Sequence, residues 1–266
     1  MSVKTRIAQL NTRLAEKLTV KGVEADGAET TTALIDKMDD IEVGGKYEEL
    51  FNLITNDNTD YSYLFHNTKG MSSPPVLDTS NVERFDYMFY GVGDGTGKVD
   101  GFYVGKAIAI IYMFTASKFV EIGSFTFPSG LDVQRLFQSS SVQKIGIFRT
   151  PSCKNQSFTF SGCDALTEIE GLSGSMLSGG NNTFTNCTAL TTIGGIYDDE
   201  ITGAVRVQKS PLDLDTAKRI INALSTTEIS TLFFSPTTLA YLEAEGATAP
   251  NGMTWLEYAE SKGWAY

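Results

Sequence analysis

Apolar residues recur along most of this chain with a period of about 24 residues. Six short blocks each end in phenylalanine, and these phenylalanines stand 24, 25, 23, 23 and 24 residues apart. They are Phe65, Phe89, Phe114, Phe137, Phe160 and Phe184. A fixed period of this length is typical of stacked repeats, in which each unit is one small supersecondary element. The pattern therefore predicts a solenoid, with the phenylalanines forming one ladder of its core.

Further apolar positions follow each phenylalanine in the later repeats. Residues 159–172 and 183–196 agree at 8 of 14 positions when they are aligned at an offset of 24. Cys163 and Cys187 take equivalent places, where cysteine behaves as a small buried hydrophobe. One unit holds too few apolar side chains to offset its own ordering entropy, so we expect stability to come from the contacts between neighbouring units.

The N-terminal part has a helical period instead. Residues 2–18 and 31–41 place apolar side chains three and four positions apart, which predicts two short amphipathic helices in a hairpin. The hairpin either docks on the rest of the chain or packs against copies of itself. In the second case residues 1–45 form an attachment and oligomerisation segment. The side chains that would make this contact are Val3, Ile7, Leu10, Leu14, Leu34, Met38 and Ile41.

The C-terminal part, residues 210–266, changes character again. A helix is predicted to begin at Ser210, with this serine as its cap and Pro211 at its first position. A strand at 231–234, a helix opened by Ser235 and Pro236, and a third helix at 254–262 follow. Solenoids need a cap over their last exposed ladder. We therefore expect residues 46–209 to form the solenoid and residues 210–266 its α/β cap, which is an α+β fold overall.

Composition and charge limit the possible partners. The chain has 266 residues, of which 41% are hydrophobic, and a formal net charge of −11. With 21 Lys and Arg against 32 Asp and Glu, neither nucleic acid nor an anionic membrane is an expected partner. The chain shows no apolar stretch typical of a signal peptide or of a membrane span. Three cysteines without metal-ligand spacing indicate a protein made in a reducing compartment.

The repeat residues resemble a known family. The Tyr-[Leu/Met]-Phe step, the Phe-x-x-[Cys/Ser] spacing and the Asp-Thr-Ser-Asn-Val run at 78–82 are similar to BspA-like leucine-rich repeats. The resemblance covers about residues 61–205 and is degenerate at 91–110. The patterns at 211–224 and 259–264 resemble the ends of such proteins in bacteriophage tails, and the pieces between residues 7 and 41 resemble the start of tail and fibre proteins.

This resemblance implies a virion structural or receptor-binding protein rather than an enzyme. Its implied partners are other phage virion proteins and a host-surface glycan or protein, and it implies a homo-oligomer, with a trimer favoured. The expected location is the virion, assembled in the host cytoplasm, and the alternative is the bacterial cell surface. A bacterial leucine-rich-repeat adhesion or protein-interaction factor is the second hypothesis. A glycan hydrolase is the third.

No motif predicts a catalytic, cofactor or metal site. His66 is the one histidine, and we interpret it as a turn residue. Residues 93–98 miss the spacing of a phosphate-binding loop and are interpreted as an inter-repeat loop. Asn56, Asn58 and Asp60 alternate as calcium ligands do, but Tyr61 replaces the required glycine.

Carboxylates and aromatic residues supply the remaining candidates. The run Asp198, Asp199 and Glu200 cannot face a substrate as glycosidase carboxylates do, because adjacent residues in a turn point apart. Glu168 and Glu170 would share one face of a strand. Aromatic side chains outside the predicted ladder could face a ligand, and those that we single out are Tyr90, Tyr103 and Tyr197.

Overall fold

The computed structural model of the protein describes residues 11–12, 15–16, 24–28, 33, 59–74, 77–178, 182–226 and 230–266. The predicted helical hairpin lies almost wholly outside these ranges. None of its seven proposed contact residues, from Val3 to Ile41, is among the described residues. The hairpin and its role in assembly therefore stay predictions.

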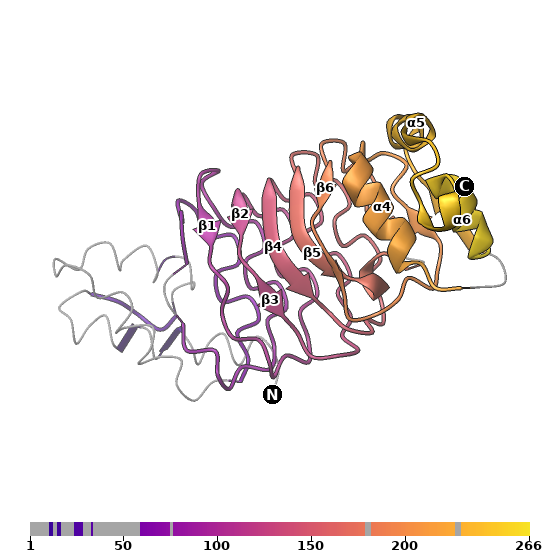
Figure 1. Ribbon diagram of the computed structural model, residues 1–266. Helices are drawn as coiled ribbons and strands as arrows, with labels where there is room; N and C mark the ends of the chain where they lie inside the picture. The colour runs from indigo at the N-terminus through magenta and orange to yellow at the C-terminus, as the bar shows by residue number, and fades with distance from the viewer. Residues whose placement is uncertain are drawn as a thin grey trace.

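The repeat region is a β-solenoid of about five turns, whose coils lie side by side along one axis (Figure 1). From residue 98 on, each coil contributes one or two strands to a parallel seven-stranded sheet, and Asp60 of the coil before pairs with Arg84 only by an isolated bridge. The path through the sheet is β1-β2-β4-β5-β6, with β3 beside β4 and β7 beside β5. The strands are β1 (Lys98–Val99), β2 (Glu121–Ile122), β3 (Phe125–Thr126), β4 (Lys144–Arg149), β5 (Glu168–Ser173), β6 (Thr192–Ile193) and β7 (Ile196–Tyr197). The predicted repeat fold is confirmed at this coarse level.

Register follows the sequence period. Ile122 pairs with Ile145, Ile145 with Ile169, and Ile169 with Ile193, so one isoleucine from each coil enters the same buried row. The degenerate segment at 91–110 keeps the same strand register, because Lys98 and Val99 pair with Glu121 and Ile122. Residues 93–98 are therefore not only a loop, since their last residue begins β1.

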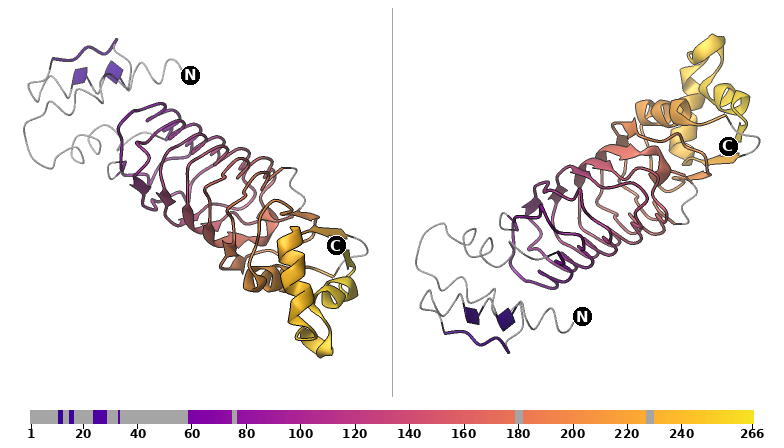
Figure 2. Two further views of the ribbon diagram at one scale, coloured as in Figure 1. Left: turned by 90° about the horizontal axis from the view of Figure 1, so that it is seen from above. Right: turned by 90° about the horizontal axis from the view of Figure 1, so that it is seen from below.

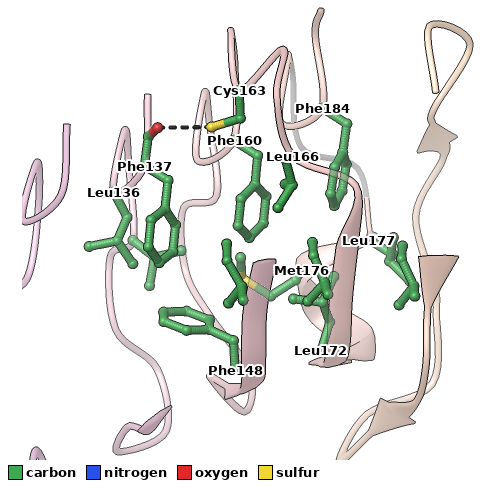
Figure 3. Close-up of a cluster of buried hydrophobic side chains, with 14 of the residues drawn as sticks. Leu136, Phe137, Phe148, Phe160, Cys163, Leu166, Leu172, Met176, Leu177 and Phe184 are labelled. Carbon is green, nitrogen blue, oxygen red and sulfur yellow. Dashed lines mark hydrogen bonds between the residues drawn. The ribbon is translucent and has the colours of Figure 1, made fainter. Parts of the chain in front are cut away.

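The six phenylalanines form a continuous stack on the side of the core opposite the sheet. Neighbouring rings lie 5.1–5.3 Å apart between centroids and are nearly parallel. All six rings are buried. Figure 3 shows Phe137, Phe160 and Phe184 facing Phe148 and Leu172, which come from the sheet. The core is thus a double layer of side chains between the corner of each coil and its strand.

Each phenylalanine sits in a tight corner with two residues in the left-handed backbone region. The first lies two positions before the phenylalanine, and the set is Tyr63, Tyr87, Tyr112, Arg135, Phe158 and Asn182. The second lies two positions after it, as Asn67, Gly91, Ala116, Ser139, Gly162 and Asn186. Alternate backbone N–H groups in the corner donate to the next coil, for example from Phe65 to the carbonyl of Met88 at 3.0 Å. These bonds supply the partners that such a bent backbone would otherwise lack.

Cysteine extends the ladder beside the phenylalanines. The Cys163 thiol donates to the carbonyl of Phe137 at 3.0 Å (Figure 3), and that of Cys187 donates to the carbonyl of Phe160 at 3.1 Å. Burial raises the pKa of Cys163 to about 12 and raises that of Cys187 as well. Both thiols therefore stay protonated, and their place in the core is that of a small hydrophobe with one weak donor.

The C-terminal region lies at the far end of the solenoid (Figure 2). It contains α4 (Leu214–Ala223), α5 (Pro236–Glu245) and α6 (Trp255–Ser261), and a parallel sheet in the order β10-β9-β8. These strands are β8 (Val205–Arg206), β9 (Ser230–Phe233) and β10 (Trp264–Ala265). A short 3-10 helix, η3 (Pro250–Gly252), lies between α5 and α6, and another, η2 (Gly174–Met176), follows β5 in the solenoid. The amide of Ile193 donates to Thr216 at 3.0 Å, so α4 covers the last edge of the solenoid sheet at β6.

The predicted start of the first C-terminal helix is wrong by several residues. The cap of α4 is Asp213, whose carboxylate accepts from the amide of Thr216 at 2.7 Å. Ser210 instead closes a turn, with its amide bonded to the carbonyl of Val207. The other two helices begin as predicted, at the caps Ser235 and Thr254.

Candidate functional site

Two hollows meet on the outer face of the solenoid sheet and form the candidate site. The first, of about 230 Å³, lies over β1, β2, β4 and β5, and the second, of about 340 Å³, lies between β1 and residues 73–74 and 77–80. Lys98 and Asp100 line both hollows. Because the strands run around each coil, a groove that crosses four of them runs along the axis of the solenoid. We call these two hollows together the sheet groove.

Ion pairs cross the first hollow from strand to strand. Lys98 pairs with Glu121, and Lys144 pairs with Glu168 at 3.2 Å. These four residues occupy the same position in successive coils, since Lys98 is in register with Glu121, Glu121 with Lys144, and Lys144 with Glu168. The alternation of sign along this row largely cancels its charge.

Two exposed carboxylates form part of the next outward-facing row of the sheet. Asp100 and Glu170 stand two residues after Lys98 and Glu168, which places each on the outer face of the sheet. Among the described residues, neither carboxylate has a hydrogen-bonding or ion-pair partner. They are the free acceptors of the sheet groove.

Glycine occupies the positions between Asp100 and Glu170 in the same row, at Gly123 and Gly146. A Cβ atom on Gly123 would lie 2.6 Å from the amide nitrogen of Gly101, and one on Gly146 would lie 2.6 Å from the Ser124 hydroxyl. Coils can therefore approach closely only where these residues lack a side chain. At these two positions the floor is formed by backbone and by the small Ser124 side chain, whose hydroxyl accepts from the amide of Ile147 at 2.9 Å.

An aromatic wall bounds the second hollow. Tyr103 is 55% exposed, and Phe102 beside it packs edge-on against Phe125 at 4.9 Å between ring centroids. A Cβ atom on Gly105 would lie within 2.9 Å of three atoms of the Tyr103 side chain. The ring therefore lies against the backbone of Gly105. Of the three aromatic candidates, Tyr103 is the one that lines the groove.

The other two aromatic candidates are engaged elsewhere. Tyr90 stacks on His66 at 5.0 Å, next to a row in which Tyr63, Tyr87 and Tyr112 stack at 4.8 and 4.6 Å. Arg135 continues this row, lying over the ring of Tyr112. Since these rings cover one another's faces, they offer a ligand mainly their edges.

Tyr197 is 37% exposed and carries the guanidinium of Arg149 over its ring at 5.6 Å.

The acidic run after β7 ties three coils together. Asp198 accepts from Arg149 of β4, at 3.2 Å from its Nε, and from the hydroxyl of Ser173 at the end of β5, at 2.7 Å. Asp199 accepts from the amide of Ser152 at 2.7 Å. These contacts give Asp198 and Asp199 a structural role. The same hydrogen bond from Arg149 is the main reason that the pKa of Asp198 is lowered.

Replacing Asp198 by asparagine is expected to lower the free energy of unfolding by about 1–2 kcal/mol at pH 7. A carboxylate whose pKa is lowered in the folded state stabilises the fold above its unfolded pKa, and this contribution is lost as the pH falls through the folded value. The difference between variant and wild type should therefore shrink in acid. Urea denaturation at a series of pH values measures it.

Asp164→Asn is the matched control, because Asp164 is an exposed aspartate of the same solenoid. It should change stability little at any pH. A loss at Asp198→Asn that does not vary with pH would show that ionisation of this carboxylate contributes nothing.

Histidine and possible metal ligands add no second site. Burial lowers the pKa of His66, and its ring lies between Tyr63 and Tyr90 in the aromatic rows. Within the described ranges, no three His, Cys, Asp or Glu side chains gather as metal ligands would. Of the calcium-like residues, Asn56 and Asn58 lie outside the described residues, and Asp60 forms a bridge to Arg84. No helix in the described part of the chain is long and apolar enough to cross a bilayer.

Sequence reasoning missed most of the groove. Lys98, Glu121 and Lys144 were not candidates, although an alignment of the coils at offsets of 23 and 24 would have shown their alternating charge. The glycine floor has no comparable signal. Known proteins offer no guide here, since no protein family, no curated protein and no solved structure matches this chain.

Proposed function

We propose that this chain is a non-enzymatic structural protein of a bacteriophage virion, carried on a tail, baseplate or head-fibre appendage, where it recognises the host surface. Its solenoid is of the BspA-like leucine-rich-repeat type, residues 1–45 attach it to other virion proteins, and it assembles as a homo-oligomer, with a trimer expected. The observation that carries the recognition role is the sheet groove, an open channel with free acceptors and an exposed aromatic ring on an outer face.

A rigid scaffold supports this role. The first hollow lies on parallel strands whose other face packs on the stacked phenylalanines, so its backbone floor is held in place by the core. Sites on such regular elements are more precisely placed than sites on loops. Repeat proteins commonly bind along the extended faces that stacking creates.

The spacing of the free carboxylates supports a role without catalysis. Asp100 directly follows β1 and Glu170 lies in β5, and β2 and β4 lie between these strands. Three strand spacings of about 4.8 Å separate them by roughly 14 Å. Glycosidase carboxylates stand about 5–9.5 Å apart, so this pair is too widely spaced for glycoside hydrolysis. Glu121 and Glu168 are held by lysines.

Immunogold electron microscopy tests the proposal. Antibodies against the purified chain should label a discrete appendage on phage particles from lysates of the source culture. Label confined to the bacterial surface would contradict the virion proposal and favour the alternative, a bacterial leucine-rich-repeat adhesion or protein-interaction factor. Antibodies adsorbed with the purified chain serve as the control, because they should label neither.

A further inference from the structure

We propose that the sheet groove binds a neutral, hydroxyl-rich glycan chain, which lies along the solenoid axis with one sugar ring against Tyr103. This inference rests on the proposed recognition function and names the class of its ligand. The groove is the place where an aromatic side chain, free carboxylates and a floor of glycine and serine meet.

The shape of the groove suits an extended chain. Its two hollows of about 230 and 340 Å³ are continuous through Lys98 and Asp100. Gly123 and Gly146 have no side chain and Ser124 beside them has a small one, so no large side chain rises between Asp100 and Glu170 over β2 and β4. Polar side chains and backbone line most of the first hollow, whereas the apolar side chains Pro74, Leu77, Phe102 and Tyr103 gather in the second.

The charge of the groove disfavours a polyanionic ligand. Lys98 and Lys144 stand in the row with Glu121 and Glu168, and each lysine is paired. A polyanion would meet these glutamates and the free carboxylates Asp100 and Glu170. A polycation would have to lie against the two lysines. The carboxylates that line the two hollows outnumber the lysines, so the charge disfavours a polyanion, and the aromatic ring and the free acceptors are what favour a neutral sugar chain.

The free groups are those that bind sugar hydroxyls. An ionised carboxylate has two oxygens that accept hydrogen bonds, and Asp100 and Glu170 have no other partner among the described residues. Vicinal hydroxyls of a sugar can supply the donors. The separation of these two carboxylates across four strands means that one chain, rather than one sugar unit, would engage both.

Tyr103 supplies the apolar contact. Its ring is held against Gly105 on one side and is 55% exposed, so it can pack against the C–H groups of a sugar ring. Phe102 beneath it is fixed by Phe125 and Phe85, which holds this wall in place. The sequence departs most from its repeat pattern in this coil. Such departures are expected at functional sites, where a local rule is broken for binding.

Saturation-transfer NMR on the full chain tests the inference. The probes are neutral hexasaccharides of glucose, mannose, galactose and N-acetylglucosamine, together with a sulfated hexasaccharide and decalysine. We expect transfer to at least one neutral probe. Tyr103→Ala should weaken that binding by about tenfold or more, and Tyr103→Phe should retain most of it. Asp100→Asn and Glu170→Gln should each weaken it as well.

Tyr241→Ala is the matched control, since Tyr241 is 47% exposed on α5, outside the groove. It should leave binding unchanged. The inference is overturned if no neutral probe gives a signal that depends on Tyr103, or if only the sulfated probe or decalysine does. If particles carry the immunogold label but the chain binds no neutral probe, the glycan inference fails and the virion proposal stands. If the chain binds a neutral probe but is absent from particles, the virion proposal fails and the glycan inference stands.

Discussion

Phe137→Ala is expected to lower the free energy of unfolding by about 3–5 kcal/mol. The ring of Phe137 is fully buried in the middle of the phenylalanine stack, 5.3 Å from the rings of Phe114 and Phe160 and 5.3 Å from that of Phe148. Its removal leaves a cavity between three coils, whose backbones are held apart by their hydrogen-bond ladder and cannot collapse to fill it. Denaturation in guanidinium chloride measures the loss.

The control is Ile108→Ala, a truncation of a side chain that is 62% exposed in the same solenoid. Substitutions of this kind usually change stability by no more than about 0.5 kcal/mol. Equal losses at Phe137 and Ile108 would mean that stacking of the coils does not depend on the phenylalanine ladder.

Gly174→Ala is expected to have the second largest effect, a loss of about 3 kcal/mol in the free energy of unfolding. A Cβ atom on Gly174 would lie 1.8 Å from the carbonyl oxygen of Asp199, so one of two backbones must move. Those backbones belong to successive coils, and the movement would strain the contacts of Asp199 with Ser152 and of Asp198 with Ser173. Thermal and chemical denaturation both report the change.

Gly195→Ala makes the same chemical change in a different setting. The nearest atoms to its new Cβ would belong to the side chain of Tyr197, which is exposed and can turn aside. We expect a loss of about 1 kcal/mol or less. If Gly174→Ala were as mild as Gly195→Ala, close approach of the backbones at Gly174 would not limit the packing of the coils.

The period of the chain predicted the solenoid because one buried residue type recurs at each corner. Phe160 and Phe184 could be aligned by eye, and the structure places them in contact at 5.1 Å. Even the degenerate coil kept its strand at Lys98–Val99, because parallel pairing depends on backbone groups that every residue carries.

Outward-facing features were harder to predict, because their residue types change from coil to coil. The left-handed corner position is Tyr112 in one coil, Arg135 in the next and Phe158 in the one after, so no motif identifies it. The helix start was misplaced because Ser210 and Asp213 are both good caps, and only tertiary contacts choose between them. The sheet groove depends on which residues of different coils meet, and a single coil does not contain that information.

The one-to-one pairing of coils also bears on how the length of such proteins changes over generations. Each coil of 23 to 25 residues offers its neighbours the same donors, acceptors and ring. Unequal recombination that duplicated or removed one whole unit in frame would leave every coil paired with its neighbours, because each new contact between coils would repeat the hydrogen bonds and ring stacking of an existing one. The groove would gain or lose one strand width, about 4.8 Å, with no other redesign. The length of the groove would thus change in single genetic steps, each a whole unit long.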